Sequence, residues 1–316
     1  MLPCTDRFLP ILDQLGCDVI VPDVNERLSE DEILTYAGRF DGTICGDDRY
    51  SGRVIKQCAP RLKVISKWGT GIDSIDKSAA DALGIPVFRT ANAFTVPVSD
   101  SVLAYILAFS RKQPWLDRNI KRGGWKKIPG KSLAESILGV IGVGNIGKAV
   151  LKKAHAFDMR LLGNDVVSIS QEFTKKFKVD MVSLEDLLSQ ADFISINCDL
   201  NPTSRHLINE KTLSLMKPSA VIINTARGPI IDEAALINAL ENKDIAGAAL
   251  DVFEIEPLPD NSPLLSMDQV MLAPHNSNSS PLAWEAVHWN TIRNLLVGLG
   301  IPLDKFDAIK KEKTRM

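Results

Sequence analysis

Short runs of apolar and β-branched residues alternate with longer stretches of mixed polarity along almost the whole chain. Because the runs are nearly continuous in apolar residues, they are typical of parallel strands that helices cover on both faces. The pattern therefore predicts an α/β protein of the doubly wound type. The expected strands are 18–22, 42–46, 62–66, 85–89, 137–142, 160–165, 193–197, 220–225, 246–253 and 269–274.

The expected strands fall into two sets, which predicts two doubly wound parallel-sheet domains. We place the boundary near 92–101, ahead of a long helix from about Asp100 to Lys121. A last helix, 282–299, is expected to return to the smaller domain. The predicted domains are 1–96 together with 282–316, which would be discontinuous, and 97–281.

Composition narrows the possible functions. The chain has 316 residues, a net charge of -2 and no block of lysine or arginine, so nucleic acid is not an expected partner. The longest helix-like apolar stretch, 101–110, is far shorter than the roughly 20 residues that cross a bilayer. Five cysteines without CxxC spacing indicate reduced thiols in a cytoplasmic protein, and no metal site is expected.

A glycine motif, GxGxxG, lies between an expected strand and an expected helix. Gly142 permits a tight turn, Gly144 lets the backbone approach a pyrophosphate, and Gly147 lets the helix pack on the strand. The amides of Asn145 and Ile146 would then face the phosphates from the helix N-terminus. The motif is weak by itself, but its position after a strand and before a helix favours dinucleotide binding.

Asp165 ends the strand that follows this helix. This is the position from which a carboxylate accepts hydrogen bonds from a ribose diol. A carboxylate there would repel a 2′-phosphate, and residues 166–168 provide no arginine to neutralise one. The sequence therefore favours NAD over NADP.

Three polar residues each follow a later apolar run: Arg227 in "INTARGPIID", Glu256 in "LDVFEIEP" and His275 in "LAPHNS". An arginine can bind a carboxylate through two hydrogen bonds, and a histidine can exchange a proton near neutral pH. A glutamate beside that histidine would raise its pKa by favouring the charged ring. Glu254 is a second candidate for that glutamate. With the glycine motif, the trio predicts a nicotinamide-dependent dehydrogenase acting on a small 2-hydroxy acid.

The other histidines are interpreted as packing or surface residues, because a lone histidine is usually structural. These are His155, His206 and His288.

With these motifs in place, the chain resembles the D-isomer-specific 2-hydroxyacid dehydrogenase family, and within it the phosphoglycerate dehydrogenase-like members. The resemblance covers nearly the whole chain and implies a Rossmann cofactor domain and a flavodoxin-like substrate domain. Its most specific blocks are "WGTGIDSID" (68–76), "GVIGVGNIG" (139–147), "INTARGPIIDEAAL" (223–236), "GAALDVFEIEP" (247–257) and "APH" (273–275).

The resemblance implies roles for the catalytic trio. Arg227 is similar to the arginine that binds the substrate carboxylate and polarises the reacting carbonyl, and His275 to the general acid/base. The spacing of five residues after Asp251 selects Glu256 as the partner of His275. Asp251 itself resembles the aspartate near the nicotinamide carboxamide.

Further positions follow from the same resemblance. Cys198, Thr225 and Ala226 match residues that line the cofactor. The backbone of Lys67, Trp68 and Gly69 matches the loop that helps to bind the substrate carboxylate.

The substrate stays open between 3-phosphoglycerate and a small acid such as hydroxypyruvate or glyoxylate. Arg49 and Lys67 are candidates for binding a phosphate or a second carboxylate, and Trp68 is a candidate for narrowing the pocket. An NAD(H)-sensing corepressor-like protein on the same fold is the alternative function.

Two further expectations depend on the resemblance. The helix at about 100–121 and the stretch that follows it resemble a dimerisation segment, so a homodimer is expected. The usual first strand of the family would precede Phe8, where only "MLPCTDR" is available. We therefore expect that strand to be short or missing.

Overall fold

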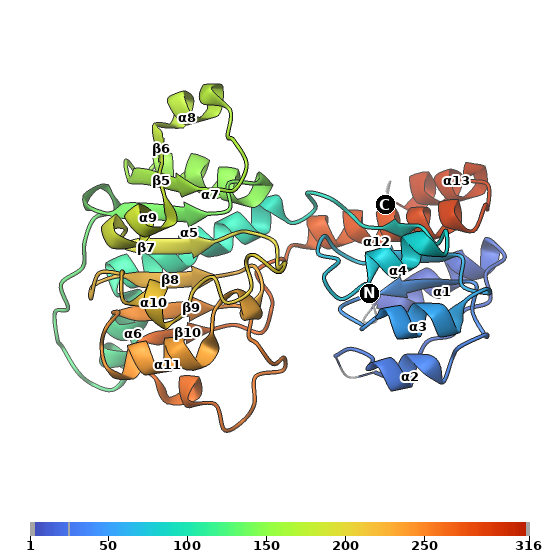
Figure 1. Ribbon diagram of the computed structural model, residues 1–316, viewed down its shortest axis with the longest axis horizontal. Coiled ribbons are helices and arrows are strands. Elements are labelled where there is room, and N and C mark those ends of the chain that lie inside the picture. Colours follow the sequence, from blue (N-terminus) through green and yellow to red (C-terminus); the bar gives the residue numbers. More distant parts are fainter. Residues whose placement is uncertain (1–3, 25, 314–316) are drawn as a thin grey trace. The chain divides into compact units, whose positions relative to one another are not determined.

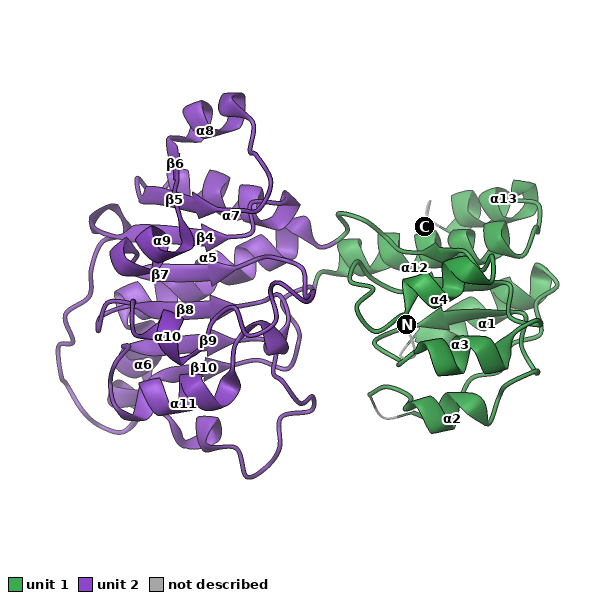
Figure 2. Ribbon diagram, viewed as in Figure 1, with its two compact units in different colours: residues 1–93, 280–316 green, residues 94–279 purple. Residues whose placement is uncertain are grey.

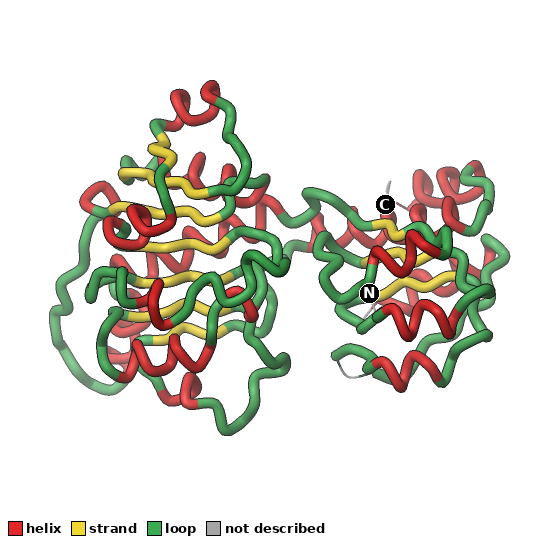
Figure 3. The backbone as a smooth tube through the Cα atoms, in the orientation of Figure 1, coloured by secondary structure: helices red, strands yellow, loops and turns green. Residues whose placement is uncertain are grey.

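A computed structural model of the protein describes residues 4–24 and 26–313. The chain forms two compact units, Met1–Ala93 with Ser280–Met316, and Phe94–Ser279 (Figure 2). The sequence prediction placed the boundaries at 96/97 and 281/282. Both units contain parallel strands joined by helices (Figures 1 and 3), so the predicted α/β class is confirmed.

The larger unit is built on a seven-stranded parallel sheet with the order β6-β5-β4-β7-β8-β9-β10. The strand order reverses between β4 and β7, as in a Rossmann dinucleotide-binding fold. The strands are β4 (Ile137–Ile141), β5 (Arg160–Asn164), β6 (Val179–Met181), β7 (Phe193–Ile196), β8 (Val221–Asn224), β9 (Gly247–Leu250) and β10 (Val270–Leu272). Of these, only β6 was not predicted.

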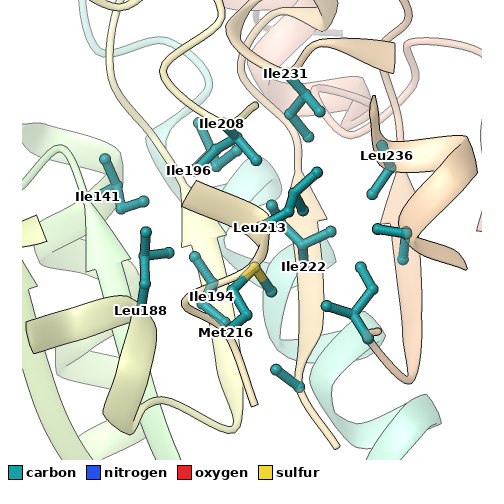
Figure 4. Close-up of a cluster of buried hydrophobic side chains, with 14 of the residues drawn as sticks. Ile141, Leu188, Ile194, Ile196, Ile208, Leu213, Met216, Ile222, Ile231 and Leu236 are labelled. Carbon is teal, nitrogen blue, oxygen red and sulfur yellow. The ribbon is translucent and has the colours of Figure 1, made fainter. Parts of the chain in front are cut away.

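Helices cover both faces of this sheet. One face packs on α5 and α7, and the other on α9, α10 and α11, where a cluster of buried isoleucine and leucine side chains lies (Figure 4). The helices are α5 (Thr95–Arg111), α6 (Gln113–Lys121), α7 (Asn145–His155), α8 (Gln171–Phe177), α9 (Leu184–Gln190), α10 (Glu210–Leu213) and α11 (Glu233–Glu241), and the short 3-10 helices are η2 (Leu133–Glu135), η3 (Gly228–Ile230) and η4 (Pro263–Ser266).

The prediction of a single helix from about Asp100 to Lys121 is wrong in one respect, because the structure divides this stretch into two helices, α5 and α6. Lys112 adopts a left-handed conformation with a φ of 57° between them, and Pro114 follows at the start of α6. A proline has no amide hydrogen to donate to the preceding helical turn, and it fits best in the first turn of a new helix.

The smaller unit has a three-stranded parallel sheet in the order β1-β2-β3. One face packs on α2, α3 and α4, and the other on α1, α12 and α13. The elements are α1 (Thr5–Gln14), α2 (Glu30–Leu34), β1 (Gly42–Cys45), α3 (Gly52–Cys58), β2 (Val64–Lys67), α4 (Lys77–Ala82), β3 (Val87–Phe88), α12 (Pro281–Gly298) and α13 (Asp304–Lys313).

The expected strand at 18–22 does not form. Val19, Ile20 and Val21 are exposed and belong to no strand. Together with β1, they line a cavity of about 860 Å³. An isolated β-strand is not stable without a neighbour to complete its hydrogen bonds, so an apolar run alone does not produce one.

The residues before Phe8 were expected to contain at most a short first strand. From residue 4 onward the described part of this segment is helical and leads into α1. Residues 1–3 lie outside the described residues.

Helix starts follow the local sequence. Several helices begin at a serine or aspartate whose side chain accepts a hydrogen bond from the first turn. These N-cap residues include Ser29, Ser51, Asp76, Ser170, Ser183, Asp232 and Ser280. Helix α7 differs, because it begins after Gly144, which has no side chain to cap it.

None of the helices in the described part of the chain combines the length and the apolar character needed to cross a membrane.

Candidate active site

The candidate residues of the larger unit lie at one edge of its sheet. Parallel strands have their carboxyl ends on the same side, and each candidate residue follows a strand end. The glycine motif follows β4, Asp165 follows β5, and Cys198 comes after β7. Arg227, Asp251 and His275 lie in the segments after β8, β9 and β10.

Two glycines of the motif are required by packing. Gly142 has a φ of 88°, and a Cβ added there would lie 2.5 Å from the backbone nitrogen of Cys198. A Cβ on Gly147 would lie 2.1 Å from the carbonyl oxygen of Gly142. A Cβ on Gly144, by contrast, would meet nothing within 4 Å. The loop is therefore closed on its inner side and open at Gly144, where α7 begins.

This arrangement fits a bound dinucleotide. The uncapped N-terminus of α7 directs backbone N–H groups, including that of Ile146, toward the open side, which is favourable for a phosphate. Thr225 provides a second observation that fits a ligand here. Its hydroxyl oxygen is buried and has no hydrogen-bond partner among the described residues. A buried hydroxyl without a partner is costly, and a ligand atom can supply the hydrogen bond.

Asp165 is tied to the glycine loop. One carboxylate oxygen accepts a hydrogen bond from the Val143 amide at 2.6 Å, and the other accepts one from Val167 at 3.0 Å. The negative charge at the end of β5 is therefore held in place beside the motif.

Three further positions assigned to the cofactor, Cys198, Thr225 and Ala226, lie just after β7 and β8. Burial raises the pKa of the Cys198 thiol to about 11, so it stays protonated at neutral pH. The Ala226 amide donates to the side-chain oxygen of Asn224 at 3.0 Å, and the Asn224 amide group donates to the Arg227 carbonyl at 2.9 Å. Asn224 thus shapes the turn that carries Thr225, Ala226 and Arg227. Asn224 was not among the predicted site residues, although a polar residue at the end of a buried strand is a signal for such a role.

The segment with Arg227 packs tightly against the segment with Glu256. A Cβ on Gly228 would lie 1.9 Å from the carbonyl carbon and oxygen of Phe253. This contact leaves no room for any side chain at residue 228. It fixes the backbone next to Arg227 relative to the backbone three residues before Glu256, and sequence reasoning did not identify it.

His275 and Glu256 form a direct pair. The ring nitrogen Nδ1 of His275 lies 2.9 Å from Oε2 of Glu256, and both side chains are partly buried. The second oxygen, Oε1, accepts the Phe253 amide at 3.0 Å. With Nδ1 donating to the carboxylate, Nε2 becomes the nitrogen that can exchange a proton.

Asp251 has a role that the sequence did not reveal. Its side chain is 1% exposed, and its two oxygens accept the amides of Asn276 at 2.8 Å and Ser277 at 2.9 Å. Its backbone carbonyl also accepts the His275 amide at 2.8 Å. His275 has a φ of 50°, which is uncommon for a residue with a side chain. Asp251 therefore holds His275 in this unusual conformation.

Glu254, the competing glutamate, pairs with a different histidine. Its Oε1 lies 2.5 Å from Nε2 of His206. The two glutamates of this segment are thus divided between two histidines, Glu256 with His275 and Glu254 with His206.

The candidate substrate residues belong to the smaller unit. Lys67 is 3% exposed, and its ammonium group donates to the Gly46 carbonyl and, at 2.6 Å, to Asp47. Arg49 is exposed and forms an ion pair with Glu30 at 3.2 Å. Gly69 has a φ of 124°, where a side chain would be strained, and its carbonyl accepts the Thr90 amide.

Trp68 makes a hydrogen bond that the sequence did not predict. Its indole N–H donates to Nδ1 of His288, on α12, at 2.8 Å. Burial lowers the pKa of His288 to about 4, so the ring is neutral at ordinary pH and can accept this bond. His288 is thereby a packing residue, as expected, but one that orients Trp68.

The larger unit thus combines a Rossmann sheet, a glycine turn that is open at Gly144 and a glutamate–histidine pair, which is the type of site that a dinucleotide-dependent dehydrogenase has. Residues 103–277 match the family described as "D-isomer specific 2-hydroxyacid dehydrogenase, NAD binding domain".

Curated relatives and solved structures are similar over most of the chain. A D-3-phosphoglycerate dehydrogenase from Methanocaldococcus jannaschii is 37% identical over 90% of this chain, which corresponds to 54% of that protein. A glyoxylate reductase from Thermofilum pendens is also 37% identical over 90% of this chain and 86% of its own length. The D-lactate dehydrogenase from Aquifex aeolicus, solved with NAD and lactic acid, matches with a TM-score of 0.82, 25% identity and 95% coverage of both chains.

The chain belongs to the D-isomer specific 2-hydroxyacid dehydrogenase family. The expected cofactor, NAD, and the expected class, an oxidoreductase of 2-hydroxy acids, are those of this family. The chain spans about half the length of the phosphoglycerate dehydrogenase that it matches, with 54% of that protein covered.

Replacing Asp251 with asparagine should destabilise the larger unit and lower activity. A carboxamide has one acceptor oxygen, so one of the two amides of 276 and 277 would face an NH2 group instead. We expect a loss of about 2–3 kcal/mol in the free energy of unfolding, measured by urea denaturation. Asp260→Asn, at an exposed loop position, is the matched control. Equal unfolding midpoints for the two variants would contradict the anchoring role.

Proposed function

We propose that this chain is an NAD-dependent D-2-hydroxyacid dehydrogenase, with the larger unit as the cofactor domain and the smaller unit as the substrate domain. The observation that carries the proposal is the 2.9 Å contact between His275 and Glu256, at the sheet edge that also holds Arg227 and the glycine turn. A proton-exchanging group and a carboxylate-binding cation beside a dinucleotide site are what a hydride transfer on a 2-hydroxy acid requires.

The roles of the trio follow from this chemistry. The nicotinamide cofactor, when bound, exchanges a hydride with carbon 2 of the substrate. In oxidation, neutral His275 takes the hydroxyl proton at Nε2, and in reduction the protonated ring gives it to the developing alkoxide. Arg227 binds the substrate carboxylate and stabilises negative charge on the reacting oxygen. Glu256 orients the ring and favours its charged form.

Asp165 supports the choice of NAD over NADP. Because both of its oxygens accept backbone amides, the charge stays at the end of β5, where the 2′-hydroxyl of the cofactor would bind. A 2′-phosphate would meet this fixed negative charge.

For the substrate, we propose a small 2-oxo acid without a phosphate group, such as glyoxylate or hydroxypyruvate. The ammonium group of Lys67 is buried and bonded to Asp47, which supports a role in holding the backbone of its loop rather than in binding a phosphate. Trp68, oriented by His288, adds bulk to the same loop.

For the location of the protein, we propose the cytoplasm. The five cysteines all carry free thiols, which supports a reducing compartment.

The test of this function is NADH oxidation, followed by absorbance, with glyoxylate, pyruvate, hydroxypyruvate and 3-phosphohydroxypyruvate. We expect turnover of a small acid, and His275→Ala should reduce kcat by at least about a hundredfold while NADH still binds. A strong preference for the phosphorylated acid would overturn the substrate proposal. If NADH binds without turnover of any acid, the NAD(H)-sensing alternative replaces the enzyme.

The pH dependence tests the pair itself. Reduction needs a protonated His275, so the reductase rate should fall as pH rises. Glu256→Gln removes the charge that favours the protonated ring, and the midpoint of that fall should therefore move to lower pH by about one unit or more. The measurement is kcat/KM for reduction between pH 5 and 10. A midpoint unchanged by Glu256→Gln would exclude electrostatic coupling between the two side chains.

We also propose a homodimer that uses α6 and the stretch that follows it. Trp125, in that stretch, is 85% exposed, and Ile120 on α6 is also exposed. Large exposed apolar side chains are typical of protein interfaces. Light scattering at micromolar concentration should give the mass of two chains, and Trp125→Ser should shift it toward one. A single-chain mass for the unmodified protein would refute the dimer.

A further inference from the structure

A second glutamate–histidine pair lies in the larger unit, next to the pair of the candidate active site. His206 is in the segment after β7, and Glu254 is in the segment after β9, two residues before Glu256. Their side chains meet at 2.5 Å and are 40% and 31% exposed. The pair therefore connects two segments at the carboxyl edge of the sheet.

Both members are also fixed through their backbones. The His206 amide donates to the Pro229 carbonyl at 2.9 Å, and Asn209 donates to the His206 carbonyl at 2.9 Å. The Glu254 amide donates at 3.2 Å to a carboxylate oxygen of Glu233, the first residue of α11. His206 adopts a φ of 49°, a left-handed conformation that these contacts hold in place.

Glu254 belongs to the short backbone segment that also carries Glu256, and this segment is tightly packed. Gly228 leaves no space between its own backbone and the peptide that joins Phe253 to Glu254. The amide of Phe253 in turn donates to Oε1 of Glu256. A shift of the Phe253–Glu254 peptide would therefore move the hydrogen-bond donor that orients the Glu256 carboxylate.

We propose that His206 and Glu254 are positioning residues, which hold the 253–256 segment so that Glu256 meets His275. The proposal rests on the proposed function for the role of His275. Neither residue is proposed to touch the reacting atoms. They act through the Phe253 amide on Glu256, and through Glu256 on the charge and orientation of the His275 ring.

This role differs from simple stabilisation. A polar side-chain pair exposed to this extent contributes little to the free energy of unfolding. Loss of the pair should therefore leave the fold intact and change the position of the Glu256 carboxylate relative to His275 instead. A structural role would have the opposite signature, a lower unfolding midpoint with an unchanged His275.

The experiment uses the full chain with His206→Ala, Glu254→Ala and the double variant. Two readouts are kcat and KM for the acid that the unmodified protein reduces best, and the pH titration of the His275 ring by NMR. We expect kcat to fall roughly three- to tenfold with KM nearly unchanged, and the His275 titration midpoint to move to lower pH. The double variant should resemble the single variants, because all three break the same contact.

Two variants serve as controls. Glu254→Gln keeps an oxygen that can accept a hydrogen bond from His206, so it should retain more activity than Glu254→Ala. Lys77→Ala breaks an exposed ion pair with Asp81 on α4 and should change neither readout.

An unchanged kcat and an unchanged His275 titration in His206→Ala would overturn the proposal. A lower unfolding midpoint in that variant, with His275 unaffected, would also overturn it. The ring titration needs no substrate, so it separates this failure from a failure of the proposed function, in which the unmodified protein would reduce no acid.

Discussion

The close approach of Gly142 to the end of β7 is the constraint on which the candidate site depends. A Cβ at residue 142 would lie 2.5 Å from the Cys198 nitrogen, so the ends of β4 and β7 are in contact where the strand order reverses. At this reversal the connecting helices leave on opposite faces and open a crevice above the strand ends. The parallel direction of the strands then brings Arg227, Asp251 and His275 to the same edge. One glycine thus helps to decide where the chemistry can occur.

Much of this arrangement could be predicted because it depends on residues close together in the sequence. The apolar runs predicted every strand of the larger sheet except β6, where Asp180 interrupts a run of only three residues. Gly142, Gly147 and Asp165 could be interpreted because their spacing implies a strand, a turn and a helix. The residues pointed to Glu256 as the partner of His275 but left Glu254 as a second candidate, and the resemblance selected Glu256.

What could not be predicted depends on contacts between distant segments. The run at 18–22 has the composition of a strand, but a strand also requires a neighbour to pair with, and no local pattern reports that. Asp251 follows a buried strand, yet its two bonds to the amides of 276 and 277 depend on the path of a segment 25 residues later. The partner of Lys67, Asp47, is likewise fixed by the packing of β1 beside β2.

Several residues that break local rules lie at the carboxyl edge of the larger sheet, although others, such as Lys112 and Lys178, lie elsewhere. His275 has a positive φ, the carboxylate of Asp251 is buried, and the hydroxyl of Thr225 is buried with no partner in the described part of the chain. Each feature costs free energy in the protein alone, and the packed sheet beneath supplies the stability that maintains them. A sequence selected only for folding would remove such features, because apolar or glycine substitutions would relieve them. The buried carboxylate of Asp251 and the positive φ of His275 occur directly beside the His275–Glu256 pair, and this is a physical reason, independent of any resemblance, to place the chemistry there.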